Sequence, residues 1–228
     1  MVVNIMSIVD RGDCIHSMDI SHIEQMIREF CSDEHAASDL YDLLAVVAER
    51  NLIDPEPEEL ERGAQFVIGY IEQVPYMLKV AMTAAVNVGL ESEMENIIEM
   101  VHSYWIMDHD VIPDHLGIIG LLDDAYCSLT TLQAVSDHYQ LQTGKYLFPD
   151  DLTAANQVLR KIIGDPYVTD LDRFVTNAIT EAGIMQAVKS LASENKQKNF
   201  QASANIWNHG PAGRMPMDDL KGLGLTED

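Results

Sequence analysis

Apolar residues recur along most of this chain at the three- and four-residue spacing of an α-helix. Ile23, Met26, Ile27 and Phe30, for example, fall on one helical face. The same spacing predicts helical segments over residues 21–30, 36–51, 54–74, 76–90, 91–107, 115–144, 149–166 and 169–195. The period continues past Pro75, which ends or kinks a helix, so the segments on its two sides can belong to one helix. The total is then about seven helices.

No segment alternates apolar and polar residues with the two-residue period of a strand. We therefore predict an all-α protein, a single multi-helix bundle in which residues 1–195 form one helical domain. Residues 196–228 are rich in Gly, Pro, Asn and Lys, which predicts an irregular, extended or flexible C-terminal tail. Phe200, Ile206 and Trp207 in this tail are residues that favour burial. They predict either a latch onto the chain's own core or a docking peptide for a partner.

The segment that carries the strongest signal is "DVIPDHLGIIGLLDDAY", residues 110–126. Pro113 disfavours helix at the residue before it, and Asp114 is placed to cap the helix that follows. That helix is apolar on nearly all sides, which predicts a central position in the bundle. At least one of Asp123 and Asp124 should then be partly buried. A buried carboxylate needs hydrogen-bond donors, a cation or a proton.

Three hypotheses follow for these aspartates. In the first, they are structural: Asp110 and Asp114 fix the turn and cap the central helix, while Asp123 or Asp124 bonds back to the turn. In the second, they bind a divalent cation such as Mg²⁺ or Ca²⁺, as a cation-binding domain or a metal-dependent hydrolase. The ligands would be Asp108, Asp110, Asp114, Asp123 and Asp124. In the third, a pair of carboxylates acts as general acid and base.

The order and spacing of residues in this region resemble the YkvA-like family of domains of unknown function, over about residues 65–140. The resemblance rests on a tyrosine before an Asp-x-Ile-Pro-Asp turn, a glycine-containing apolar helix start and an Asp-Asp pair: Tyr104, Asp110, Ile112, Pro113, Asp114, Gly117, Gly120, Asp123 and Asp124. It implies a small helical domain without an established reaction, and its occurrence beside other modules favours interaction over catalysis. The chain lacks that family's proline before the first aspartate and its basic, membrane-associated flanks, so membrane association is not carried over.

The net charge of the chain limits the kinds of partner that it can bind. The chain holds 14 Lys and Arg against 37 Asp and Glu, a formal net charge of −23. Residues 1–74 carry −12, residues 75–150 carry −9 and residues 151–228 carry −2. Such a surface repels phosphate backbones and anionic lipids, which disfavours direct binding to nucleic acid or to membranes. A basic protein partner fits the charge, and so does an acidic mimic of nucleic acid that binds a basic protein.

Other features favour a binding protein over an enzyme. The sequence contains none of the common motifs of nucleotide-binding proteins, zinc proteases or serine hydrolases. Three widely separated cysteines predict reduced thiols in the cytoplasm, and no apolar run is long enough to predict a membrane span. We therefore expect an acidic, partner-binding or regulatory helical protein that needs no cofactor.

Overall fold

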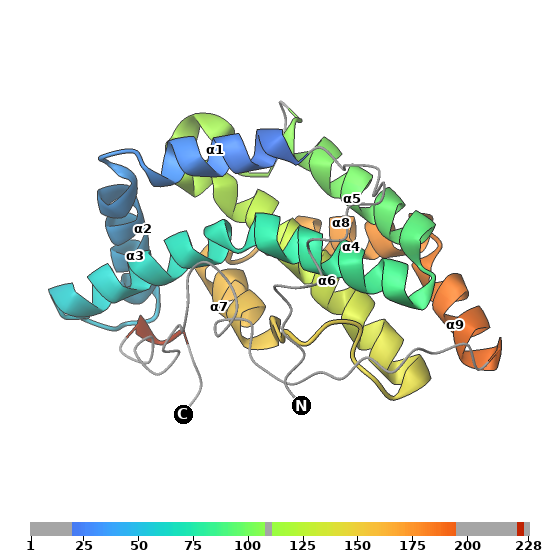
Figure 1. Cartoon of the computed structure of the whole chain (residues 1–228). Helices are drawn as coiled ribbons and strands as arrows, with labels where there is room; N and C mark the ends of the chain where they lie inside the picture. Colours follow the sequence, from blue (N-terminus) through green and yellow to red (C-terminus); the bar gives the residue numbers. More distant parts are fainter. Residues whose placement is uncertain (1–19, 108–110, 195–222, 226–228) are drawn as a thin grey trace, which may run out of the picture.

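The computed structural model describes residues 20–107, 111–194 and 223–225 (Figure 1). Within these ranges the chain forms nine α-helices and one 3-10 helix, and no strand, which confirms the predicted all-α fold. The elements are α1 (Ser21–Cys31), α2 (Ala36–Arg50), α3 (Pro57–Glu72), α4 (Val74–Val88), α5 (Glu91–Trp105), η2 (Asp114–Gly120), α6 (Leu121–Thr143), α7 (Thr153–Ile163), α8 (Tyr167–Glu181) and α9 (Ile184–Glu194). None of the described helices is long and apolar enough to cross a membrane.

Helix α6 is the centre of the bundle, as its apolar pattern predicts. It contacts α3, α4, α5, α7, α8, α9 and η2, and Figure 1 shows it running through the middle of the molecule. Both Asp123 and Asp124 in its first turn are fully buried. The rest of the core is formed by one continuous cluster of apolar side chains from all the helices around α6. The remaining elements are therefore positioned by how they cover this helix.

Two predicted helices are each divided by a glycine. The helix expected over residues 115–144 starts only at Leu121, because Gly117 has φ 66° and ψ −133° and separates α6 from the 3-10 turn before it. The helix expected over residues 169–195 is divided into α8 and α9 at Gly183, which has φ 72°. Positive φ ends a right-handed helix, and glycine adopts it without a steric penalty. An apolar period alone does not reveal such a break.

The C-terminal tail is only partly described. Phe200, Ile206 and Trp207, the expected anchors, lie outside the described residues, so the choice between latch and docking peptide stays a prediction. Three tail residues are described, however, and they were not expected to be core. Leu223 and Leu225 are each 1% exposed and belong to the apolar cluster of the bundle.

The end of α2 holds a leucine in a strained conformation. Leu52 has φ 58° and is 95% exposed. Its N–H donates to the carbonyl of Glu49, and the N–H of Ile53 donates to the carbonyl of Ala48, at 3.0 and 2.9 Å. These two bonds form a Schellman motif, in which the left-handed position is usually glycine. Leucine therefore carries a conformational cost here that its exposed side chain does not offset.

We predict that Leu52→Gly stabilises the protein by about 0.5–1 kcal/mol, because relief of the left-handed strain exceeds the added backbone entropy of the unfolded chain. Urea unfolding followed by circular dichroism measures the change. Leu141→Gly is the matched control: Leu141 is also exposed, but it lies inside α6. That variant should lose about 1 kcal/mol. Equal losses in both variants would contradict the argument.

Candidate functional site

The predicted aspartate turn is built around the carboxylate of Asp123. Its Oδ2 atom accepts a hydrogen bond from the Tyr104 hydroxyl at 3.0 Å and another from the backbone N–H of Ile112 at 3.0 Å. Tyr104 is the penultimate residue of α5, Ile112 lies in the turn and Asp123 lies in the first turn of α6. The expected bond from the aspartate pair back to the turn is therefore present, and Asp123 makes it. We call this set of three residues the clasp.

The surroundings of Tyr104 keep its hydroxyl protonated, and so able to donate. Burial raises the pKa of the Tyr104 phenol, and the neighbouring Cys127 and Asp123 raise it further. Its ring packs against Phe174 of α8, with ring centroids 4.7 Å apart. Burial and the charges of Asp123 and Asp124 also raise the pKa of the Cys127 thiol. A protonated, buried thiol of this kind is a poor nucleophile, so Cys127 is suited to packing.

Asp124 contributes to the same region through its backbone. Its carbonyl accepts a hydrogen bond from the Ser128 hydroxyl at 2.7 Å, and the same hydroxyl accepts from the indole N–H of Trp105 at 2.9 Å. Trp105 is 1% exposed and Ser128 is fully buried. The last two residues of α5 are thus both hydrogen-bonded to α6, Tyr104 through Asp123 and Trp105 through Ser128.

Asp114 does not occupy the predicted N-cap position of the central helix. Pro113 occupies the N-cap position of η2, and Asp114 is the first residue of that 3-10 helix. Helix α6 begins seven residues later, with Gly120 at its N-cap position. The predicted position assumed a continuous helix from residue 115, which Gly117 interrupts. The side chain of Asp114 lies outside what the structure describes.

The cation-site hypothesis stays a prediction. Asp108 and Asp110 lie outside the described residues, so only Asp123 and Asp124 of the five candidate ligands have described side chains. Among the described residues, no group of three or more His, Cys, Asp or Glu side chains could hold a metal ion. If the five aspartates bind Mg²⁺ or Ca²⁺, calorimetric titration should give saturable heat that Asp123→Asn abolishes. An unchanged melting temperature with chelator would count against such a site.

The clasp itself predicts a large effect on stability. Asp123→Ala should destabilise the protein by about 2–4 kcal/mol, because it leaves the buried Tyr104 hydroxyl and the part-buried Ile112 N–H without their acceptor. Tyr104→Phe, which removes one of the two bonds, should cost about 1–2 kcal/mol. Urea unfolding measures both. Asp42→Ala, at an exposed aspartate of α2, is the control and should stay within about 0.5 kcal/mol of wild type. Wild-type stability of Asp123→Ala would contradict the clasp.

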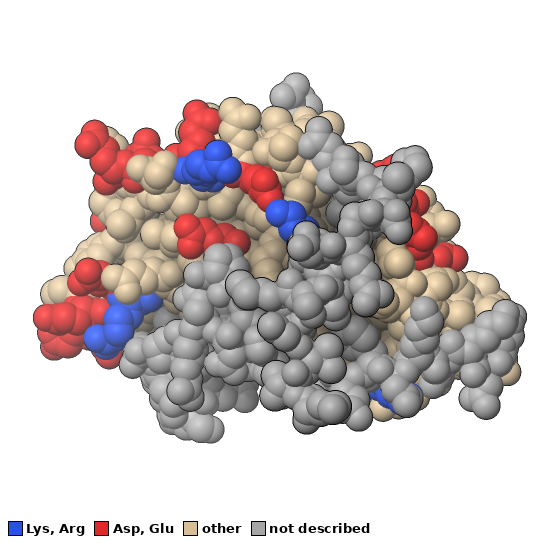
Figure 2. Space-filling view, in the orientation of Figure 1, with Lys and Arg blue, Asp and Glu red and all other residues tan. Residues whose placement is uncertain are grey.

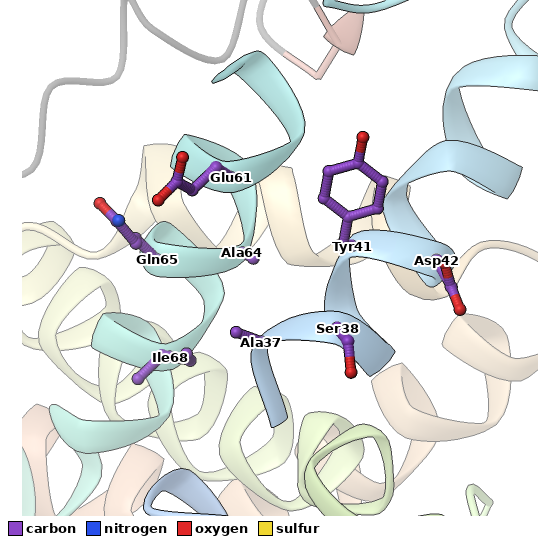
Figure 3. A pocket seen from close by; sticks show the side chains of 8 residues that line it. All are labelled: Ala37, Ser38, Tyr41, Asp42, Glu61, Ala64, Gln65 and Ile68. Carbon is purple, nitrogen blue, oxygen red and sulfur yellow. The ribbon is translucent and has the colours of Figure 1, made fainter. Parts of the chain in front are cut away.

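A second site lies on the surface between α2 and α3. A groove of about 310 Å³ opens there, and in Figure 3 Tyr41 projects from α2 while Glu61 and Gln65 project from α3. Ala37, Ala64 and Ile68 supply an apolar floor. Its complete lining is Ala37, Ser38, Tyr41, Asp42, Glu61, Ala64, Gln65 and Ile68. We call it the α2–α3 groove.

The rim of the α2–α3 groove is acidic and uncompensated. Asp42 and Glu61 are both exposed, and neither forms an ion pair with a described residue. Residues 36–72 contain nine acidic residues and two basic ones, a net charge of −7. Figure 2 shows acidic side chains gathered over the end of the molecule where α3 begins, and others along the α1 side. The groove therefore lies in a region of negative potential.

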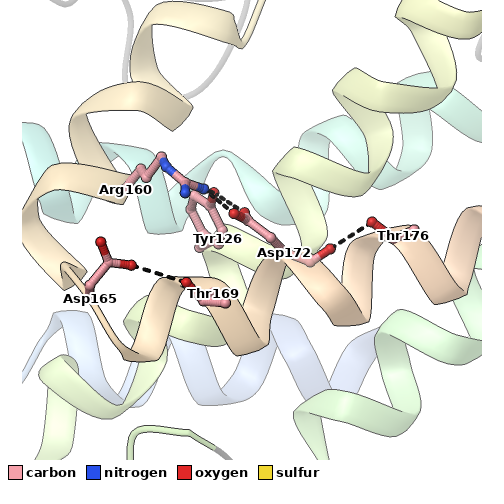
Figure 4. Close-up of polar contacts among 6 residues, drawn as sticks. All are labelled: Tyr126, Arg160, Asp165, Thr169, Asp172 and Thr176. Carbon is pink, nitrogen blue, oxygen red and sulfur yellow. Dashed lines mark hydrogen bonds and ion pairs between the residues drawn. The ribbon is translucent and has the colours of Figure 1, made fainter.

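A third polar cluster joins α6, α7 and α8 (Figure 4). Asp172 accepts a hydrogen bond from the Tyr126 hydroxyl at 2.8 Å and forms an ion pair with Arg160. Burial raises the pKa of Tyr126 to about 12, and Asp172 adds to the shift. Asp172 raises the pKa of Arg160 as well. With its tyrosine protonated and its charges paired, the cluster is suited to holding three helices together.

Sequence reasoning identified Asp123 and missed the other two sites. Tyr126, Arg160 and Asp172 are 34 and 12 residues apart in sequence, and no motif connects them. Asp42 and Glu61 follow the ordinary pattern of charges on a solvent-facing helix side. The acidic excess of residues 1–74 was the one signal that pointed to the region of the groove.

Comparison of the chain with protein-family models, with curated proteins and with solved structures found no match.

Proposed function

We propose that this chain is a protein-binding domain whose α2–α3 groove holds a basic segment of a partner protein. The observation that carries the proposal is the groove itself, with an apolar floor, a tyrosine wall and two rim carboxylates that have no ion-pair partner among the described residues. A segment that places Lys or Arg beside an apolar side chain complements both parts. The function is therefore binding, with the activity of the complex supplied by the partner.

The two parts of the groove contribute differently to binding. Exposed ion pairs contribute only about 0.2–1 kcal/mol each and weaken with salt, so Asp42 and Glu61 mainly steer and orient the partner. Removal of apolar surface from water supplies the rest, and a tyrosine on the wall is a residue type that often dominates such contacts. The volume of about 310 Å³ suits one or two side chains of a docked segment.

The surrounding charge favours a basic protein over a nucleic acid. A net charge of −7 over residues 36–72 repels a phosphate backbone and attracts Lys- and Arg-rich surfaces. An acidic mimic of nucleic acid would use the same negative charge. In that version of the proposal the partner is a protein whose basic surface also binds DNA or RNA.

The proposal predicts saturable binding of a basic amphipathic peptide. The probe is a fluorescein-labelled 14-residue peptide in which Leu recurs every three or four positions and Lys fills the others. Fluorescence anisotropy should show binding that weakens between 50 and 200 mM salt, because the rim contacts are ionic. The peptide with Glu in place of Lys should not bind. A scrambled Leu and Lys order should bind more weakly, because it lacks one apolar face.

Matched variants of the chain locate the binding. The double variant Asp42→Asn, Glu61→Gln should weaken binding roughly 2- to 30-fold, the equivalent of two exposed ion pairs. Tyr41→Ala should weaken it at least about fivefold. The control is Glu91→Gln with Glu99→Gln, which removes two exposed carboxylates of α5 and the same total charge. Equal weakening in the control would show non-specific attraction and would overturn the assignment to the groove.

A further inference from the structure

The segment Leu223–Leu225 is packed into the bundle although it lies far along the chain from the last helix. Residues 195–222 separate it from the end of α9. Leu223 and Leu225 are nevertheless each 1% exposed, as buried as the leucines of the central helix. A short segment with an alternation of leucine, glycine and leucine thus has a defined place on the folded domain.

The place is formed by α2, α3 and the loop between them. A Cβ atom on Gly63 of α3 would lie 2.6 Å from Cδ1 of Leu223 and 2.8 Å from Cδ1 of Leu44. Leu223 therefore packs onto the bare backbone of α3, beside Leu44 of α2. A side chain at position 63 would require the terminal methyl groups of Leu223 and Leu44 to shift. We call this place the Leu223 seat.

The segment is matched to the seat by its own glycine as well. Gly224 has φ +66°, and a Cβ atom there would lie 2.5 Å from Cδ1 of Ile53 in the α2–α3 loop. The position thus needs glycine for two reasons, its left-handed backbone and its close approach to Ile53. Glycine at position 63 permits Leu223 to approach α3, and glycine at position 224 permits the segment to approach Ile53.

We infer that the Leu223 seat is a recognition site for a Leu-Gly-Leu peptide segment, occupied in this structure by the chain's own residues 223–225. Its ligand is a short apolar segment with two leucine side chains that pack into the seat and a glycine between them that adopts positive φ. Because the segment belongs to the same chain as the seat, its binding is intramolecular, so occupancy in cis needs only modest affinity. The seat is distinct from the α2–α3 groove, whose lining does not include Leu44, Gly63 or Ile53.

Such a segment should leave its seat without unfolding of the bundle. Two leucine side chains bury little apolar surface compared with the cluster around α6, so local opening costs less than global unfolding. The N–H of Ile53 donates to the carbonyl of Ala48 within the end of α2, so this bond does not involve the segment. We therefore expect the seat to persist when the segment leaves it.

The first test uses the full-length chain with Leu223→Ser and Leu225→Ser, which empties the seat. A labelled peptide of residues 219–228, DLKGLGLTED, should bind this variant saturably and should be displaced by the unlabelled peptide. It should bind the wild-type chain at least tenfold more weakly, because the seat is filled in cis. Circular dichroism confirms that the variant is folded. A folded variant that binds no peptide would overturn the inference.

Matched changes on the two sides of the contact test its geometry. The Gly224→Val peptide should bind at least tenfold more weakly, because valine disfavours positive φ and would collide with Ile53. Adding Gly63→Ala to the emptied chain should weaken the original peptide comparably, although alanine favours the helix. Undiminished binding in either case would contradict the seat.

A second measurement on the wild-type chain covers the case in which the serine variant fails to fold. Native-state hydrogen exchange should show the amides of residues 223–225 at least tenfold less protected than the core amides of α6, because they open locally. Equal protection in both places would show that the segment opens only when the bundle unfolds. It would then be an integral part of the core, and the inference would be wrong.

Discussion

The carboxylate of Asp123 is the constraint from which the rest of the arrangement follows. A charge in the interior is stable only where donors replace water, and Asp123 obtains its donors from two other elements, the end of α5 and the turn before η2. The helix that carries it contacts most of the other elements. The hydrogen bonds of this one carboxylate thus determine how α5 and the turn approach α6. The packing around α6 then determines how the other helices are arranged.

Helical periodicity predicts most of this fold because a solvent-facing helix must bury one stripe and expose the other. It fails at Gly117 and Gly183, where the apolar pattern continues while the backbone turns to positive φ. The pattern of apolar residues indicates which side chains favour burial, but it carries no information on backbone dihedral angles. A glycine inside an apolar run can equally lie in a helix, so the division into η2 and α6 required the structure.

The candidate sites were predictable to different degrees. Burial of Asp123 follows from the apolar surface of its helix, and its need for donors follows from burial. The groove does not follow, because it depends on how α2 and α3 pack, and its rim residues Asp42 and Glu61 resemble any solvated charges. The Leu223 seat was missed because three residues show no period and the tail around them is rich in Gly and Pro. The seat is indicated instead by the burial of Leu223 and Leu225 and by the close contacts at Gly63 and Gly224.

The clasp and the two surface sites are physically connected. Asp123 holds the backbone of Ile112, the turn leads directly into η2, and η2 contacts α2. Helix α2 is otherwise held chiefly by α3, and Leu223 packs between Leu44 and Gly63 of these two helices. The position of α2 beside α3 thus depends in part on the buried carboxylate, through Ile112 and η2, and the C-terminal leucines pack against the same two helices. The proposed binding surface on α2 and α3 is therefore supported from the core by hydrogen bonds to a buried carboxylate and from the tail by apolar packing.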